Sequence, residues 1–329
     1  MVAVTSAAAS VLGPRGTVIV LGNFDGVHRG HREIARSAAE IAAGRGLRAR
    51  IVTFFPHPSA VLGRGAPPVL TSQARKRELA LALAPPIELY EQPFDLSYAA
   101  QSPRAFAEHL RATHDARVVV VGDNFRFGKG RAGDFAALAE LGRELGFEAR
   151  AESLVVDDDG PVSSTRIRAA IAAGDVVTGA RLLGRPHMVE GRVEHGKKLG
   201  RTIGFPTCNL GEVIELVPAL GIYATLVDLV DSAGRSRALA RGATSVGTNP
   251  TVGTGNERTI ETYLFDGLVP DLARELYGER IRIHFAARLR GEERFDGLDA
   301  LKAQMDRDVA SSRAITEQAF PSPAGDAWA

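Results

Sequence analysis

Cysteine, long apolar runs and an excess of one charge are all missing from this sequence. Its 329 residues include a single cysteine, Cys208, which excludes an intramolecular disulfide and a cysteine-based zinc cluster and favours a reducing compartment. No stretch approaches the roughly 18 consecutive apolar residues of a membrane-spanning helix. Lysine plus arginine number 40 and aspartate plus glutamate 39, for a formal charge of +1. This balance argues against a protein that coats nucleic acid or a membrane surface, so phosphate recognition must be local.

Length and composition predict a folded protein of two domains. Hydrophobic residues make up 45% of the chain and charged residues 24%, as in ordinary globular proteins. The length of 329 residues exceeds the roughly 100–200 that are typical of one domain. Residues 1–10 are mildly apolar but lack the positive start of a signal peptide, and Gly-Pro-Arg-Gly at 13–16 interrupts them. We therefore expect a loose N-terminal tail and a cytoplasmic protein.

Residues 14–184 alternate strand-like and helical segments. The strand candidates are 18–21, 50–54, 117–121 and 148–156. Between them, 31–43 and 135–145 have apolar residues at helical spacing, and Gly44 and Gly146 follow as helix-ending glycines. The alternation predicts βαβ units and hence a Rossmann-like α/β domain, with a parallel sheet and a ligand at the carboxyl ends of its strands.

Residues 185–313 have the pattern of antiparallel β structure. The strand candidates are 188–193, 221–229, 259–265 and 281–288. In the last of these, apolar and polar residues alternate, as in a sheet with one buried face. A single helical pattern follows over 298–309. We predict a small antiparallel β-barrel with a C-terminal helix, followed by a flexible tail over 314–329.

The first chemical motif is the stretch GNFDGVHRGH at residues 22–31, between a predicted strand and a predicted helix. Gly22 and Gly26 allow the backbone to approach a ligand closely, and the amides at a helix start attract anions. His28 and His31 are three residues apart and suit a polyphosphate whose charge grows as it leaves. The alternative is a turn with two surface or capping histidines, but the strand–glycine turn–helix context favours phosphate.

A second motif is VSSTRIR at residues 162–168, which opens a predicted helix. Ser163 or Ser164 can cap this helix. Arg166 and Arg168 then occupy the first turn, where the helix dipole disfavours positive charge. The pattern therefore indicates an anionic ligand, and its alternative is a pair of exposed arginines.

The loop VGDNFRFGKGR at residues 121–131 ends a predicted strand and combines glycines, aromatic rings and cations. Such a loop can hold a nucleotide or stack on an aromatic ring system. It is equally compatible with a basic surface turn.

A glycine-rich run spans residues 191–209 in the second half. It is not a P-loop, because Gly-x-x-x-x-Gly-Lys-Ser/Thr is never completed and no helix pattern follows. Backbone amides near Gly196 and Gly200 can still wrap phosphates, with Lys197 close in sequence.

Three oxygen-bearing side chains, two at the end of this run and one beyond it, are candidates for the chemistry. Thr207 and Asn209 alternate in an extended segment, so both face the same way and can meet one Mg²⁺ ion. An ordinary turn into a strand explains the same spacing, and spacing alone favours it. Glu261 shares a strand face with Tyr263 and Phe265 and is a possible general base or a solvated strand residue.

These motifs together resemble a known family. The first half resembles bacterial FAD synthetases in GNFDGVHRGH, TFFPHP at 53–58, GDNFRFG at 122–128 and SSTRIR at 163–168. The second half resembles riboflavin kinases in GFPTCN at 204–209, GIYA at 221–224, SVGTNPT at 245–251, Glu261 and LYG at 276–278. The whole chain is thus similar to the bifunctional riboflavin kinase/FAD synthetases of bacteria.

The resemblance implies two ATP-dependent steps. Residues 185–313 would phosphorylate riboflavin to FMN, and residues 14–184 would adenylylate FMN to FAD with release of pyrophosphate. It implies catalytic roles for Glu261 as the proton acceptor and for His28 and His31 at the leaving polyphosphate. The implied contacts to nucleotide or phosphate are Gly22, Phe24, Gly26, Asn124, Ser164, Thr165, Arg166, Arg168, Gly196, Lys197 and Gly200. Mg²⁺ would arrive with ATP at Thr207 and Asn209, and flavins would be substrate and product, with no nucleic-acid, membrane or obligate protein partner.

Three features depart from the family pattern. Cys208 stands where the family has Ala, Val252 replaces Phe, and the segment 267–274 is longer than the usual turn. Two other functions compete: an enzyme of narrower scope, either a riboflavin kinase alone or another small-molecule nucleotidyltransferase, and a non-catalytic flavin- or nucleotide-binding regulator. The intact histidine pair and Glu261 favour the two activities together.

Overall fold

The computed structural model describes residues 16–83, 87–196, 204–248, 258–266, 276–323 and 327–328. Contacts divide the chain into two compact units. The first holds the described residues of Met1–Phe24, Gly30–Pro67 and Arg77–Val156, and the second those of Asp25–Arg29, Pro68–Lys76 and Asp157–Ala329. This division differs from the predicted boundary between 184 and 185, which stays a prediction about functional domains.

The first unit contains a parallel sheet of five strands, in the order β3-β2-β1-β4-β5, which confirms the predicted α/β class. The strands are β1 (Thr17–Leu21), β2 (Arg48–Phe55), β3 (Ile87–Pro93), β4 (Ala116–Gly122) and β5 (Glu148–Glu152). The sequence pattern missed β3. It also extended β5 too far, because the chain turns after Glu152 toward the short strands β6 (Val156–Asp157) and β7 (Gly160–Pro161).

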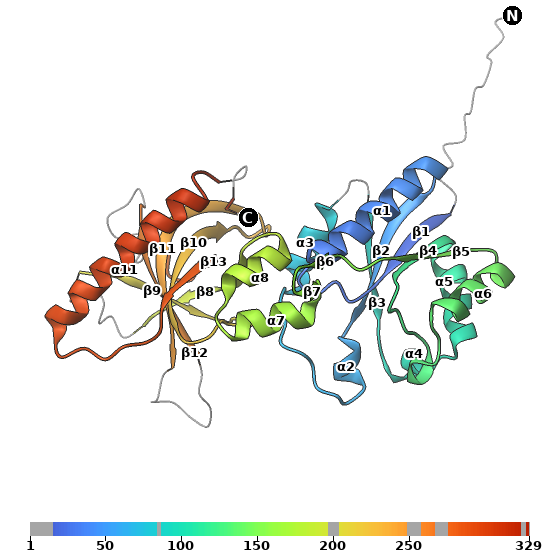
Figure 1. Cartoon of the computed structure of the whole chain (residues 1–329), viewed down its shortest axis with the longest axis horizontal. Helices are drawn as coiled ribbons and strands as arrows, with labels where there is room; N and C mark the ends of the chain where they lie inside the picture. The colour runs from blue at the N-terminus through green and yellow to red at the C-terminus, as the bar shows by residue number, and fades with distance from the viewer. Residues whose placement is uncertain are drawn as a thin grey trace, which may run out of the picture. The chain divides into compact units, whose positions relative to one another are not determined.

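Helices pack on both faces of this sheet (Figure 1). The helices are α1 (Arg29–Arg45), α2 (Pro58–Val61), α3 (Gln73–Leu81), α4 (Leu96–Ala99), α5 (Pro103–His114) and α6 (Phe135–Leu145), with the 3₁₀ turn η1 (Lys129–Arg131). Val18 and Val20 of β1 pack toward alanines of α1, whereas Ile19 and Leu21 pack toward α5 and α6. Alternate residues of β1 are therefore buried on opposite faces, as a doubly wound sheet requires.

The glycines that end these helices fit the prediction at one site and correct it at another. Gly146 closes α6 with φ +80°, as predicted. Helix α1 instead continues through Gly44 to Arg45, and Gly46 takes the left-handed conformation with φ +63°. The left-handed residue that ends the helix thus lies two positions later in the sequence than the pattern indicated.

The second unit contains a closed barrel in the order β10-β11-β12-β9-β8-β13, which confirms the predicted antiparallel barrel. Its strands are β8 (His187–Glu194), β9 (Thr207–Gly211), β10 (Gly221–Val230), β11 (Ser236–Thr248), β12 (Arg258–Phe265) and β13 (Arg280–Arg290). The helices α7 (Ser164–Ala172) and α8 (Val176–Leu183) precede the barrel, and α8 packs on β13 and β8. Because the barrel is closed, each of its strands has a hydrogen-bonded neighbour on both sides.

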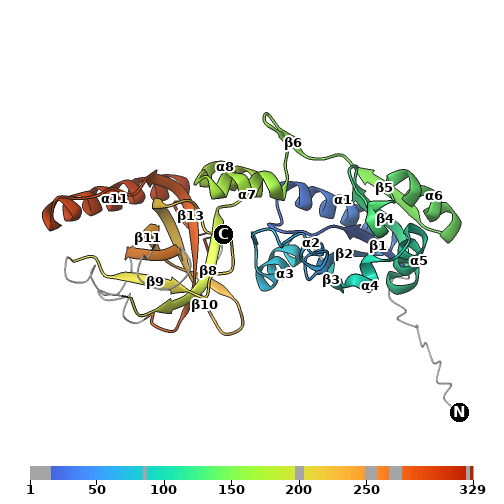
Figure 2. The same cartoon turned by 90° about the horizontal axis from the view of Figure 1, so that it is seen from below.

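The predicted C-terminal helix is α11 (Leu298–Ala319), which packs on β10, β11 and β13 (Figure 2). Asp308 of α11 forms an ion pair of 2.7 Å with Arg290, and the Ser312 hydroxyl donates to the carbonyl of Gly242 at 2.8 Å. Residues 314–319 belong to this helix rather than to the predicted flexible tail. The backbone N–H of Trp328 donates to the buried Asp228 carboxylate at 3.0 Å.

Candidate active sites

A pocket of about 650 Å³ opens at the carboxyl ends of the parallel strands in the first unit. Gly22 follows β1, Phe54 lies at the end of β2, Phe94 follows β3, and Asn124 follows β4. The strand order reverses between β1 and β4, and ligands of open α/β sheets bind at such a switch point. The structure therefore places Gly22 and Asn124, both predicted from sequence, on one pocket.

Aromatic rings form one wall of this pocket. The ring centroids of Phe54 and Phe94 are 5.7 Å apart, those of Phe94 and Tyr98 5.6 Å, and those of Phe125 and Phe127 5.7 Å. Burial raises the pKa of Tyr98, and its buried hydroxyl has no hydrogen-bond partner among the described residues. Cations also line the pocket: Arg64, Arg126, Lys129 and Arg131. The lining suits a planar ring system that carries an anionic group.

Phe24 lies in the hydrophobic core, with only 1% of its surface exposed. Its ring stacks on the imidazole of His31 with centroids 4.6 Å apart. A Cβ atom at Gly22 would lie 3.2 Å from the same ring, so glycine gives the Phe24 ring its space. Phe24 thus holds His31 in place, a role that the sequence motif did not reveal.

His28 is buried in the second unit, with 6% of its surface exposed. Burial lowers its pKa to about 4; Asp25 opposes this shift, and Arg185 and Arg168 add to it. His28 is therefore neutral near pH 7 and can donate one N–H hydrogen bond. The preceding loop is held by Arg185, whose guanidinium donates to the carbonyl of Gly26 at 2.7 Å. Gly26 itself has a φ of +84°, which favours glycine.

Asp25 is a residue of this loop that the sequence reasoning missed as a site residue. Its carboxylate accepts hydrogen bonds from the backbone N–H groups of Leu70 and Thr71, each at 3.1 Å. The same carboxylate pairs with Arg168 of α7 at 2.5 Å. One buried acid therefore joins the motif of residues 22–31 to the motif of residues 162–168.

Ser163 caps α7, as one of the two sequence alternatives predicted. Its hydroxyl oxygen accepts the backbone N–H of Arg166 at 3.3 Å, from an extended backbone conformation. The Ser164 hydroxyl instead donates to the backbone carbonyl of Asp25 at 2.9 Å. Thr165 is exposed. At the start of α7, Ser163 and Ser164 thus already have structural partners, whereas the Thr165 side chain is exposed.

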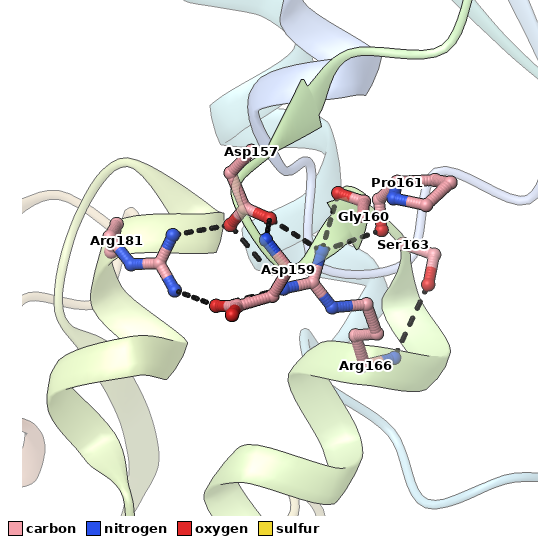
Figure 3. Close-up of polar contacts among 7 residues, drawn as sticks. All are labelled: Asp157, Asp159, Gly160, Pro161, Ser163, Arg166 and Arg181. Atoms are coloured by element: carbon pink, nitrogen blue, oxygen red, sulfur yellow. Dashed lines mark hydrogen bonds and ion pairs between the residues drawn. The ribbon is translucent and has the colours of Figure 1, made fainter.

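The Arg166 guanidinium is surrounded by the hairpin of β6 and β7 (Figure 3). It donates to Asp157 at 2.9 Å and to the two backbone carbonyls of β7 at 2.7 and 2.9 Å. Arg181 of α8 also pairs with Asp157 and reaches Asp159 at 3.1 Å. Arg166 pairing lowers the pKa of Asp157. An anionic ligand at Arg166 would compete with this carboxylate.

The second unit brings together the three residues predicted for the kinase site. In the β9–β12 pairing, Glu261 lies opposite Asn209, and the Thr207 hydroxyl is 3.5 Å from the Glu261 carboxylate. Thr207 and Asn209 are half-buried while Cys208 between them is buried, so the predicted shared face is confirmed. A Cβ atom at Gly196 would lie 2.1 Å from the amide nitrogen of Asn209, so Gly196 packs directly against that side chain.

Several predicted features lie outside the described residues: Lys197, Gly200, Val252 and the segment 267–274. Cys208 can be placed: 1% of its surface is exposed, and burial raises its pKa to about 12. Its thiol therefore stays protonated and faces the core, which accommodates the exchange from the family's Ala.

Two separate folds, each with groups suited to phosphate chemistry, define a bifunctional transferase. Residues 12–166 match the family model described as FAD synthetase, and residues 183–316 match the one described as Riboflavin kinase. The chain belongs to the bifunctional riboflavin kinase/FMN adenylyltransferase family, as the motifs implied.

Individual relatives support this membership. The bifunctional riboflavin kinase/FMN adenylyltransferase of Escherichia coli is 36% identical over 91% of this chain and 92% of its own. The Pseudomonas fluorescens protein of the same name is 37% identical over 92% of this chain and 93% of its own. A solved Streptococcus pneumoniae structure, described as a macrolide-efflux protein, matches with a TM-score of 0.79 and 30% identity, over 91% of this chain and 94% of its own. Within the described ranges, no helix has the length and apolar character needed to cross a membrane.

Proposed function

We propose that this chain makes FAD from riboflavin in two ATP-dependent steps. Residues 185–313 phosphorylate riboflavin to FMN, and residues 14–184 transfer the adenylyl group of ATP to FMN. The observation that carries the proposal is that one chain has two sites suited to phosphate chemistry. Thr207, Asn209 and Glu261 form a cluster on the barrel, and the parallel sheet has a pocket lined by aromatic and cationic side chains. The family membership supports both steps.

In the kinase step, the riboflavin 5′-hydroxyl oxygen attacks the γ-phosphorus of ATP, and ADP leaves. Glu261 accepts the hydroxyl proton. The hydroxyl of Thr207 and the amide oxygen of Asn209 are hard oxygen ligands on one strand face beside a carboxylate, a donor set that fits Mg²⁺. Mg²⁺ bound there with ATP would neutralise phosphate charge. The backbone around Gly196 and Gly200, with Lys197, holds the phosphates.

In the adenylyl step, a phosphate oxygen of FMN attacks the α-phosphorus of ATP, and pyrophosphate leaves. His28, neutral at pH 7, donates a hydrogen bond to the departing polyphosphate, and His31 does the same from the position that Phe24 fixes. The aromatic wall takes the flavin ring, and Gly22 and Asn124, which line the same pocket, border the nucleotide. We assign Gly26 to the nucleotide as well, from the motif alone.

The start of α7, in the second unit, supplies the other residues that we assign to phosphate binding. Ser164, Thr165, Arg166 and Arg168 contact phosphate groups. Because Arg166 is paired with Asp157 and Arg168 with Asp25, the polyphosphate binds to cations that already have carboxylate partners. Two fixed cations beside an anion site are electrostatically preorganised for this purpose.

The enzyme works in the cytoplasm on small molecules: riboflavin, FMN and ATP. It needs no nucleic acid, membrane or obligate protein partner in this proposal. The formal charge of +1 supports it, since it gives no overall excess of positive charge for a polyanionic partner.

One assay tests the proposal. The purified protein is incubated with riboflavin, ATP and Mg²⁺, and the flavins are separated by chromatography. FMN and FAD should both form, and a chelator should stop both steps without lowering the melting temperature. FMN alone would indicate the narrower kinase function, and unchanged riboflavin with folded protein would contradict the proposal.

A further inference from the structure

A single buried carboxylate connects the proposed phosphate-binding residues of the transferase site. We propose that Asp25 is a positioning residue for adenylyl transfer, which acts by fixing the Arg168 guanidinium. The inference rests on the proposed contact of Arg168 with phosphate, and it assigns Asp25 no contact with substrate.

The contacts of Arg168 define one orientation of its guanidinium. Its Nη2 donates to Asp25 Oδ2 at 2.5 Å, and its Nε donates to the backbone carbonyl of Pro68 at 2.7 Å. The two side chains are largely buried, with 9% of Asp25 and 16% of Arg168 exposed. Charge-assisted hydrogen bonds in a poorly solvated place are stronger than surface ion pairs. Arg168 is therefore held before any ligand arrives.

The Asp25 carboxylate is fixed in its turn by the backbone. Oδ1 accepts the N–H groups of Leu70 and Thr71, both at 3.1 Å, and the Thr71 hydroxyl donates to it at 3.3 Å. The Thr71 hydroxyl oxygen also accepts the N–H of Gly26 at 3.1 Å. The acid is thus a rigid support, and the loop that leads to His28 shares the same anchor.

The chemistry of these contacts requires a carboxylate. Every polar neighbour of the Asp25 side chain described here is a donor: two backbone N–H groups, one hydroxyl and one guanidinium. An asparagine of equal size would turn an NH₂ group toward some of these donors and leave them unsatisfied. Removal of the negative charge also leaves the largely buried Arg168 cation without this carboxylate. Both effects release Arg168 from the orientation it now has.

The test uses the full chain and both of its activities. Asp25→Asn should lower the rate of FAD formation from supplied FMN by about 10²-fold, a loss typical of a misplaced preorganised donor. The kcat of FAD formation should fall and the KM for ATP should rise. The KM for FMN and the riboflavin kinase activity should stay unchanged. Asp175→Asn is the matched control, since Asp175 only caps α8 through the N–H of Thr178 and asparagine caps equally well. It should leave both activities unchanged.

A double-mutant cycle shows whether Asp25 acts through Arg168. Arg168→Gln should impair FAD formation, and addition of Asp25→Asn to that variant should cost little more. Full activity of Asp25→Asn, a parallel loss of both activities, or additive losses in the double variant would each overturn the positioning role. Full activity of Arg168→Gln would instead refute the proposed phosphate contact itself, whereas an impaired Arg168→Gln with an active Asp25→Asn would refute only the inference.

Discussion

The two proposed sites are assembled in different ways. In the barrel, Thr207, Asn209 and Glu261 meet because two neighbouring strands pair in register, with Glu261 opposite Asn209. In the transferase half, the proposed residues come from loops after parallel strands and from the start of α7, and they depend on distant partners. Asp25 and Arg168, for example, are 143 positions apart. In the barrel, the pairing of two strands is enough to bring the three residues together, whereas the transferase residues also depend on side-chain anchors.

The two sites also differ in their existing interactions. Arg166 and Arg168 are each paired with an aspartate, and His28 is held neutral by burial. In the barrel, Thr207 and Glu261 are half-buried and share one long contact of 3.5 Å. A ligand in the transferase half therefore meets cations that already have carboxylate partners, while the barrel residues are more open to their ligands. Three predictions test this contrast, in order of decreasing effect, and a fourth concerns buried histidines in both halves.

Glu261→Gln should separate the two activities most strongly. Glutamine keeps the size of the side chain but cannot accept the proton, so riboflavin phosphorylation should fall by about 10²–10⁴-fold. Conversion of supplied FMN to FAD should persist. Chromatography of each reaction measures this, with the exposed Glu317→Gln of α11 as the control. Loss of FAD formation from FMN, with the fold intact by circular dichroism, would refute the allocation of sites.

His28→Ala should produce the opposite phenotype. Removal of a preorganised donor at the polyphosphate should cost about 10²–10³-fold in FAD formation. The variant should still phosphorylate riboflavin and should therefore accumulate FMN. Time courses with riboflavin as the only flavin would show this directly. Undiminished FAD formation would mean that the buried imidazole takes no part in the reaction.

Gly196→Ala tests the packing of the kinase cluster. Because the new Cβ atom would lie 2.1 Å from the Asn209 amide, that side chain must move. Misplacement by about 1 Å can cost up to ~10²-fold in rate, so we expect a loss of about tenfold in kinase activity. Gly44→Ala is the control, because no atom lies within 4 Å of its Cβ position in α1. Equal kinase rates for the two variants would contradict a role for Asn209.

The pH dependence of stability should reflect buried histidines in both halves. Burial lowers the pKa of His28, His114 and His187 to about 4 each. Between pH 6.5 and pH 4 the unfolded chain therefore binds protons that the folded chain does not, and the free energy of unfolding falls as the pH is lowered. Urea unfolding at several pH values measures the slope. His187→Gln, whose amide can still donate to the Leu216 carbonyl, should flatten it.

The sequence predicted those parts of the fold that have a clear local period. Strand β1, the barrel strand β13, the cap at Ser163 and the shared face of Thr207 and Asn209 all follow from near neighbours in sequence. Strand β3 was missed because it lies at the edge of the sheet and mixes buried with exposed positions. Strand β11 was missed because small and charged residues dominate it.

The roles of Asp25 and Phe24, which the sequence did not reveal, were missed for another reason. Asp25 binds the N–H of Leu70, 45 positions away, and Phe24 supports His31 through ring stacking in the core. Neither partner can be read from the motif, because a motif shows which residues are present and not which ones they touch. Both residues lie inside the stretch that the sequence selected, but their roles come from the tertiary fold.

Trp328 is the one tryptophan of the chain, and the structure places it against the barrel. The Arg241 guanidinium lies 4.8 Å from the centre of its indole ring, and the Trp328 backbone is tied to Asp228. Selective excitation of tryptophan therefore interrogates a single fluorophore at the C-terminal end of the barrel unit. Its emission maximum and its quenching by iodide report whether this end is docked or solvated, so the protein carries its own optical probe of that contact.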